Sequence, residues 1–298
     1  MEKQQHEMTD LYERYKPLLF TLAYQLMGSA VDAEDAVQDV FVKLYDVDGR
    51  NIEIPKAYLC KMVTNRCLDL IKSARRRREL YFGMWLPEPL LTDVEDTSKY
   101  LVAEDLLSYG VLVLLERLSP LERVVFVLRE ALGLNYSEIA AIVEKGDANC
   151  RKLFSRAKLK LGNLERKSSQ VSGVDEEWLQ RFIEVLVNDD IDSLVPLLAD
   201  NATVTSDGGG KVLAAVKPIN QPANVARYLL GLIRKFAPSQ EGWRLEVRFL
   251  NSQAGVIVWE KDTVDAVVLV DAMDELIHSV YIVRNPEKLQ RLKGQLVI

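Results

Sequence analysis

The spacing of apolar residues along the chain changes near residue 174. Before that point they recur at helical intervals, as in DAEDAVQDVFVKLY (32–45). After a helical stretch at 175–199, W-R-L-E-V-R-F-L (243–250) alternates apolar and charged residues, which is typical of a half-buried strand. Three more strand-like runs, A-G-V-I-V-W, A-V-V-L-V and L-I-H-S-V-Y-I-V, follow a helical pattern at about 222–236. The pattern predicts all-α domains followed by a separate α+β domain with a curved antiparallel sheet.

The composition is that of an ordinary globular protein, with 48% hydrophobic and 28% charged residues among 298. No apolar run reaches the roughly 18 residues of a membrane span, and MEKQQHEMTD is no signal sequence, so we expect a cytoplasmic protein without membrane contact. The three cysteines lack C-x-x-C spacing and only His6 and His278 could join them. We therefore expect reduced, packed cysteines, no metal site and no cofactor.

Charge is unevenly distributed along this acidic chain of net charge −6. Residues 61–79 hold seven basic and two acidic side chains, and residues 117–167 hold eleven and six. A basic helix face is often merely solvated, but two such segments indicate two separate contacts with a polyanion. The run Arg75–Arg78 would be relieved of its self-repulsion by phosphates.

A helix-turn-helix is predicted between residues 118 and 161. Ser119-Pro120-Leu121-Glu122 is a strong helix start, and Asn135-Tyr136-Ser137-Glu138 starts a shorter helix. After the turn Glu144–Asp147, a long basic helix follows. Its exposed face is expected to carry Asn149, Lys152, Arg156 and Lys160, with Arg151 and Ser155 beside them.

Two further segments need a surface to pack on. Pro87 and Pro89 stiffen the linker, but Trp85, Leu86, Leu90 and Leu91 are too apolar to lie wholly in water. T-S-D-G-G-G-K-V (205–212) ends a glycine run with lysine, yet Val212 stands where a phosphate loop needs Ser or Thr, and Val212–Val216 is strand-like. The three glycines therefore indicate either a flexible hairpin or a tight turn against another surface.

The ordered motifs resemble a known family. DAEDAVQDVFVKLY with K-A-Y-L-C-K-M-V-T-N-R-C-L-D-L-I-K (56–72) resembles region two of bacterial sigma factors. L-S-P-L-E-R-V-V-F-V-L-R-E (118–130) with N-Y-S-E-I-A-A-I-V (135–143) and the basic helix resembles region four. W-L-P-E-P, D-G-G-G-K and N-P-E-K-L are similar to motifs of the sigma-J-like subgroup of extracytoplasmic-function factors, which carries a C-terminal SnoaL-like cone. The implied domains are region two (1–80), a linker (81–105), region four (106–168) and the SnoaL-like domain (174–298).

The resemblance implies a sigma factor that binds RNA polymerase core, recognises promoter DNA and directs initiation, with the C-terminal domain regulating activity. The implied contact with the clamp of the polymerase's largest subunit uses Asp35, Gln38 and Asp39. The implied minus-ten contacts, with Tyr58 a weaker candidate, are Lys61, Asn65, Arg66, Asp69 and Lys72. Those to the minus-thirty-five element are Asn149, Arg151, Lys152, Ser155 and Arg156. Gly-Asp-Ala-Asn-Cys replaces the usual hydrophobic-Thr-Val lead into this recognition helix.

With this resemblance, the glycine turn is interpreted as an interdomain contact rather than a hairpin. The predicted partners are the linker residues Trp85, Leu86, Pro87, Glu88 and Pro89 on one side. On the other side are Asp207, Gly208, Gly209, Gly210 and Lys211, together with Asn285 and Pro286 at the start of a short terminal helix.

Two alternatives remain. SnoaL-like folds also occur in enzymes, and Asp265, Asp271 and His278 could point inward, but no acid/base pair is visible, so we predict no enzymatic activity. The other alternative is a helix-turn-helix regulator that acts without core polymerase and senses an unknown small ligand through its C-terminal domain. The acidic helix favours the sigma factor, because a simple repressor does not need one.

Overall fold

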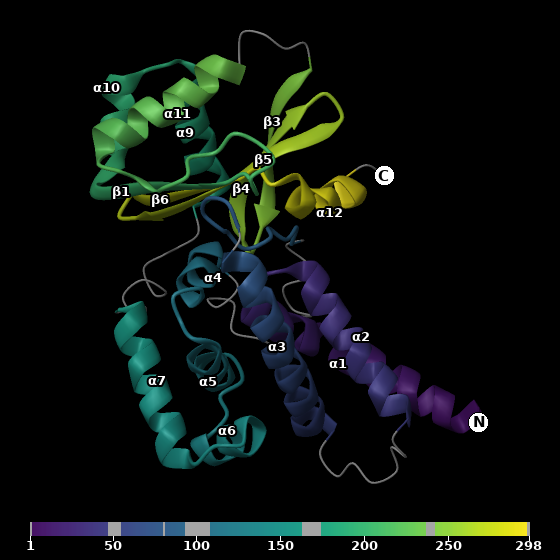
Figure 1. The fold of residues 1–298 in the computed structure, drawn as a ribbon. Coiled ribbons are helices and arrows are strands. Elements are labelled where there is room, and N and C mark those ends of the chain that lie inside the picture. The colour runs from purple at the N-terminus through teal and green to yellow at the C-terminus, as the bar shows by residue number, and fades with distance from the viewer. Residues whose placement is uncertain are drawn as a thin grey trace. The chain divides into compact units, whose positions relative to one another are not determined.

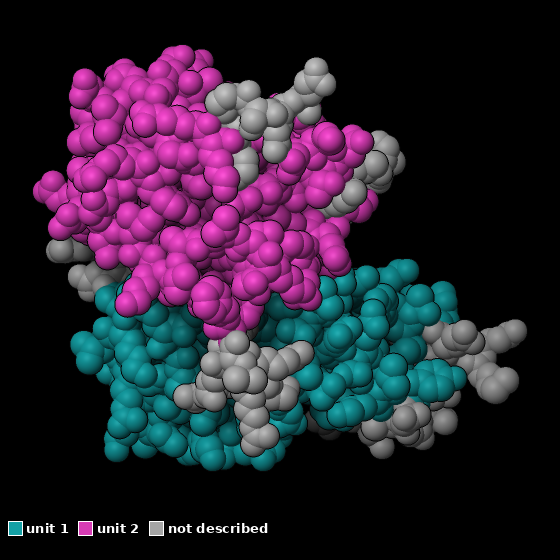
Figure 2. Space-filling view, turned by 45° about the horizontal axis from the view of Figure 1, so that its top comes forward, with its two compact units in different colours: residues 1–79, 95–107, 111–164 teal, residues 80–94, 108–110, 165–298 magenta. Residues whose placement is uncertain are grey.

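The computed structural model describes residues 2–46, 55–79, 81–92, 108–162, 174–236 and 242–296 (Figure 1). The described residues form two compact units, coloured separately in Figure 2. The first holds residues 2–46, 55–79 and 111–162, and the second holds 81–92, 108–110, 174–236 and 242–296. The described part of the linker therefore groups with the C-terminal residues, and the two helical segments form one unit.

The first unit begins with three long helices, α1 (Glu2–Met27), α2 (Ala30–Asp46) and α3 (Pro55–Glu79). Gly28, between α1 and α2, has a φ of +66°, a conformation that glycine adopts without steric cost. The helices bury apolar stripes against one another, and the predicted Val37, Val40 and Leu44 stripe of α2 is buried.

Four shorter helices follow: α4 (Tyr109–Leu115), whose first two residues group with the second unit, α5 (Pro120–Glu130), α6 (Tyr136–Val143) and α7 (Asp147–Leu161). Both predicted helix starts are capping boxes, in which Ser119 and Asn135 exchange hydrogen bonds with Glu122 and Glu138. Glu144 ends α6 in the left-handed region at φ +54°, so α7 can turn back and bury Cys150 and Ala157.

Arg123, one of the eleven basic residues in 117–167, does not lie on the surface. Its side chain is buried, and its guanidinium donates to the carbonyl oxygens of Leu115 (3.0 Å) and Leu26 (2.9 Å) and pairs with Glu116 (2.6 Å). Because Leu26 lies on α1, this arginine joins α5 to α1 within the unit.

The second unit is a six-stranded sheet with helices on it. Along the chain come α9 (Glu176–Val187), α10 (Ile191–Leu194), the 3-10 turn Val195–Leu197, β1 (Leu198–Asp207), β2 (Ile219–Asn220) and α11 (Pro222–Phe236). Then follow β3 (Trp243–Leu250), β4 (Gln253–Glu260), β5 (Thr263–Met273), β6 (Leu276–Val283) and α12 (Pro286–Leu296). The strand order is β2-β1-β6-β5-β4-β3. Helices α9 and α11 cover one face and bury the main apolar core there (Figure 1).

Two details depart from the sequence expectation. Strands β1 and β6 pair in parallel, whereas all other neighbouring pairs are antiparallel, so the sheet is mixed. Alternating apolar residues predict a strand but not its direction. Val212–Val216 is not a strand but an irregular loop after the glycine turn, in which Leu213 and Val216 are exposed.

The three cysteines are free and buried, as packing groups would be. Burial raises the pKa of the Cys60 thiol to about 11, an effect that Lys56 partly opposes. Among the described residues, no cluster of His, Cys, Asp and Glu could hold a metal ion. No described helix is both long enough and apolar enough to span a bilayer.

Candidate functional site

The acidic face of α2 carries the three residues expected to meet core polymerase. Asp35 and Gln38 are exposed to solvent. Asp39 is half-buried because its carboxylate accepts from Nε and Nη2 of Arg66, both at 2.6 Å. A predicted core contact and a predicted DNA contact are therefore paired with each other, which leaves Asp35 as the more accessible charge.

The predicted minus-ten residues lie along α3 and most of their charges are engaged. Lys61 lies 3.6 Å from Glu144 of α6, and Lys72 pairs with Asp69 at 3.0 Å. Asn65 is half-buried, and Tyr58 is exposed rather than core. Exposed pairs of this kind contribute little energy, so both lysines can exchange a carboxylate for a phosphate. The side chains of Arg75–Arg78 lie outside the described residues.

The predicted recognition residues of α7 all lie on one exposed surface: Asn149, Arg151, Lys152, Ser155 and Arg156. The guanidinium of Arg151 stacks 4.8 Å from the ring centre of Tyr136, which orients it. Lys160 instead reaches inward to Glu122 at 2.6 Å. Burial opposes ionisation of Glu122, but hydrogen bonds from Lys160 and Ser119 outweigh it and lower the pKa of this carboxyl. These exposed residues form a basic surface on α7. Helix α7 packs against α5 and α6, which both begin with a capping box.

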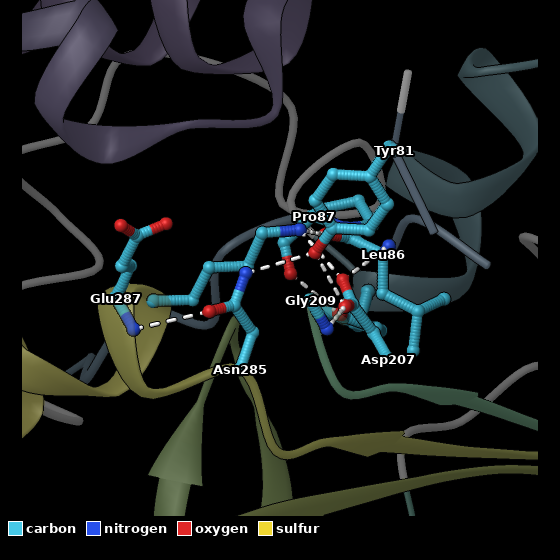
Figure 3. Close-up of polar contacts among 9 residues, drawn as sticks. Tyr81, Leu86, Pro87, Asp207, Gly209, Asn285 and Glu287 are labelled. Carbon is cyan, nitrogen blue, oxygen red and sulfur yellow. Dashed lines mark hydrogen bonds and ion pairs between the residues drawn. The ribbon is translucent and has the colours of Figure 1, made fainter. Parts of the chain in front are cut away.

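The buried carboxylate of Asp207, at the end of β1, gathers the linker around it (Figure 3). It accepts from the Leu86 N–H (2.9 Å), the Tyr81 hydroxyl (2.5 Å) and the Gly209 N–H (2.9 Å), and pairs with Lys288 (2.7 Å). Burial, followed by the hydrogen bond to Asp207, raises the pKa of Tyr81, so the phenol remains a donor. A buried charge needs this many partners to be tolerated.

The glycine turn is compact because each glycine faces an atom that a Cβ would strike. A Cβ on Gly209 would lie 2.6 Å from Asn285, and one on Gly210 would lie 3.2 Å from Phe82. Both have positive φ, at +64° and +70°. On Gly208 a Cβ would meet the carbonyl oxygen of Val212 at 2.3 Å. The turn is therefore shaped for close contact with the linker and the α12 N-terminus.

Helix α12 contributes the second half of this contact. Asn285 caps it by accepting from the Glu287 N–H, and donates to the Tyr81 hydroxyl at 2.8 Å. Lys288 also donates to the Leu86 carbonyl and lies 4.1 Å from the ring centre of half-buried Trp85. Lys211 does not reach the linker but pairs with Glu287. The remaining predicted linker residues, Pro87, Glu88 and Pro89, are buried, whereas Pro286 is exposed.

The linker continues along the β3–β4 hairpin. Leu91 bridges to Leu250, the Asn251 N–H donates to the Leu90 carbonyl (2.9 Å), and the Thr92 N–H donates to the Phe249 carbonyl (3.0 Å). The chain is thus hydrogen-bonded from Tyr81 to Thr92 on one domain. Backbone pairing of this kind leaves no signal in side-chain type, so the sequence did not predict it.

A further anchor lies where α4 begins, and sequence reasoning missed it. The buried Tyr109 donates its hydroxyl to the Pro87 carbonyl (2.6 Å), and its N–H donates to Gln253 Oε1 (3.3 Å). A Cβ on Gly110 would lie 2.2 Å from Asp271 Oδ2, the oxygen that accepts from the Tyr281 hydroxyl. The tyrosine–glycine pair ahead of an apolar helix was the available signal.

The three candidate acid/base residues are not assembled into a catalytic group. Asp265 is paired with Arg284 at 3.0 Å and lines an apolar cavity. Asp271 faces Tyr281 and Gly110, and His278 Nδ1 is 3.0 Å from Asn201 Oδ1. Neither Asp271 nor His278 is among the residues lining that cavity.

Comparison with known protein families gives one match in each of the two helical segments of the chain. Residues 11–77 match sigma-70 region 2, and residues 110–161 match sigma-70 region 4. Over 290 residues the chain is 30% identical to the ECF RNA polymerase sigma factor SigJ of Mycobacterium tuberculosis, covering 93% of this chain and 91% of the relative. The chain belongs to the ECF sigma factors.

The crystal structure of extracytoplasmic-function sigma factor SigJ from that organism superimposes on this sigma factor with a TM-score of 0.78 and 27% identity, covering 94% of this chain and 97% of the other. Probable ECF sigma factor SigI of M. tuberculosis is 33% identical over 198 residues, 65% of this chain and 68% of the relative. The fold prediction of two helical sigma segments followed by an α+β domain is confirmed, and the SnoaL-like character of that domain stays a prediction.

As a sigma factor, the protein binds RNA polymerase core and promoter DNA and directs initiation. The matches do not support the alternative of a regulator that acts without core. The family is in general not enzymatic.

Proposed function

We propose that the C-terminal domain of this sigma factor regulates initiation by holding both ends of the connection between regions two and four. The observation that carries the proposal is the buried Asp207 carboxylate bonded to Tyr81 and Leu86. The Tyr109 hydroxyl bonded to Pro87 supports it at the other end. A connection fixed at both ends restricts the distances that two DNA-binding segments can reach, which would select promoters by the spacing of their elements.

Reconstitution with core polymerase tests this role, using promoter fragments that differ only in the length between the two elements. We expect transcription from a narrow range of lengths. Equal transcription over a range of five or more base pairs would contradict the proposal, because a connection that was not held would tolerate them.

We propose that α2 meets the clamp of the largest polymerase subunit through Asp35 and Gln38, whereas Asp39 is less accessible because it is paired with Arg66. Asp35→Lys is expected to weaken core association about tenfold while leaving the unfolding temperature nearly unchanged, because this side chain is exposed. Asp39→Lys should also reduce stability, since it would repel Arg66. Titration of core binding measures the effect, with Glu13→Lys on α1 as the control. Unchanged core affinity of Asp35→Lys would remove the assignment.

We propose that α7 reads the minus-thirty-five element. Lys152→Ala and Arg156→Ala are each expected to lower promoter affinity about tenfold, because each removes an exposed positive group from the helix face. Loss of a base contact would depend on promoter sequence, whereas loss of a phosphate contact would weaken all sequences alike and reduce the salt slope. Lys158→Ala is the matched control, since Lys158 faces Glu130 at 3.6 Å. If Lys158→Ala loses as much promoter affinity as the other two variants, the assignment of Lys152 and Arg156 to the DNA contact is wrong.

The minus-ten contacts are proposed for Lys61, Asn65, Arg66 and Lys72 of α3, where positive charge can follow an exposed strand. Asp69 holds Lys72 in place in this proposal. The protein would act in the cytoplasm, with core polymerase and DNA. We propose that its C-terminal domain binds a small effector rather than catalysing a reaction. Asp265, the candidate acid/base residue that lines its cavity, is held in an ion pair with Arg284.

A further inference from the structure

A cavity of about 80 Å³ lies between the sheet and the two helices that cover it. Helix α9 contributes Phe182 and Leu186, helix α11 contributes Leu229 and Leu232, and Trp243 and Val256 line it from β3 and β4. The volume is several times the roughly 10–15 Å³ that one water molecule needs. Apolar cavities take up apolar molecules of matching size.

The only charged residues lining the cavity, within the part of the chain that the structure describes, are Asp265 and Arg284. Arg284 Nη2 lies 3.0 Å from both carboxylate oxygens of Asp265, and Arg284 Nη1 donates to the Leu213 carbonyl at 2.8 Å. Both side chains are largely buried, at 11% and 19% exposure. The two charges are paired with each other, so the cavity offers neither an unpaired cation for an anionic ligand nor an unpaired carboxylate for a basic one.

We propose that this cavity is a binding site for a neutral, apolar small molecule of about the size of a single-ring hydrocarbon. Burial of apolar surface would drive binding, and a charged ligand would lose hydration without gaining a counter-charge. The inference specifies the ligand of the effector site proposed above and rests on that proposal. Since Asp265 is held by Arg284, the cavity binds its occupant without acid/base chemistry.

Three probes with the same ring test the proposal on the full-length protein without polymerase or DNA: toluene, benzoate and benzylammonium. The indole N–H signal of Trp243 is followed by nuclear magnetic resonance, with Trp85 in the linker as the internal control. We expect toluene to shift the Trp243 signal with a dissociation constant of about 0.1–1 mM. Benzoate and benzylammonium should bind at least tenfold more weakly.

Two variants locate the site. Ala266→Leu fills part of the cavity and should weaken toluene binding, whereas Asp265→Asn keeps the shape, leaves Arg284 without its carboxylate and should raise benzoate affinity about tenfold. The proposal is overturned if toluene leaves Trp243 unshifted, if the charged probes bind as well as toluene in the unaltered protein, or if neither variant changes affinity. Because no transcription is measured, these results are separate from those that test promoter spacing.

Discussion

Asp207→Ala is expected to release the linker and to lower the free energy of unfolding of the second unit by about 3–5 kcal/mol. The substitution leaves the largely buried ammonium of Lys288 without its carboxylate and the Leu86 N–H without an acceptor. Urea denaturation measures the stability. Chymotrypsin, which cuts after aromatic residues, should cleave at Tyr81 or Trp85 much faster than in the unaltered protein.

The same variant separates a structural role from a regulatory one. If the linker contact limits promoter spacing, Asp207→Ala should widen the range of spacings that support transcription. Asp262→Ala, in the exposed turn between β4 and β5, is the control and should behave as the unaltered protein does. Slow cleavage together with an unchanged spacing range in Asp207→Ala would show that the linker is held by other contacts.

Gly110→Ala is expected to destabilise the second anchor by about 2–4 kcal/mol. The added Cβ would lie 2.2 Å from Asp271 Oδ2 and 2.8 Å from the other two carboxyl atoms, so the whole carboxylate must rotate and abandon the Tyr281 hydroxyl. Thermal unfolding measures the loss.

Gly231→Ala is the matched control, because Gly231 is also helical and a Cβ there meets nothing within 4 Å. It should stabilise α11 by about 0.5–1 kcal/mol, since alanine loses less backbone freedom than glycine on folding. Equal effects of the two substitutions would mean that Asp271 moves aside at little cost.

Local features of this fold could be predicted because they depend on residues close in sequence. The caps at Ser119 and Asn135 each need a partner three positions on, and both were predicted with that partner. The strand at 243–250 follows from its own alternation. Local patterns could not show that the separate motifs belong to one sigma factor, and the family resemblance supplied that.

Features that depend on distant pairing were not predicted. Strand β1 runs parallel to β6 because of the path that the chain takes between them, and the residues of the two strands do not indicate that direction. The contacts of Tyr109 and Gly110 involve Gln253 and Asp271, more than 140 residues away. Arg123 was included in the count of basic residues in 117–167, and the sequence does not show that two carbonyl oxygens and one carboxylate oxygen accept its hydrogen bonds.

The contact between Arg123 and Leu26 has a consequence for the geometry of initiation. The names of the two promoter elements place their centres about 25 base pairs apart, which is about 85 Å of B-form DNA at 3.4 Å per base pair. Helices joined by a 2.9 Å hydrogen bond cannot occupy both elements at once. If α3 and α7 contact the two elements as proposed, we expect regions two and four to separate on the promoter and to give up the Arg123–Leu26 bond and the Lys61–Glu144 pair. Free energy from binding core and DNA would have to offset that loss. We therefore expect the contact to lower the affinity of the protein for promoter DNA when polymerase is absent.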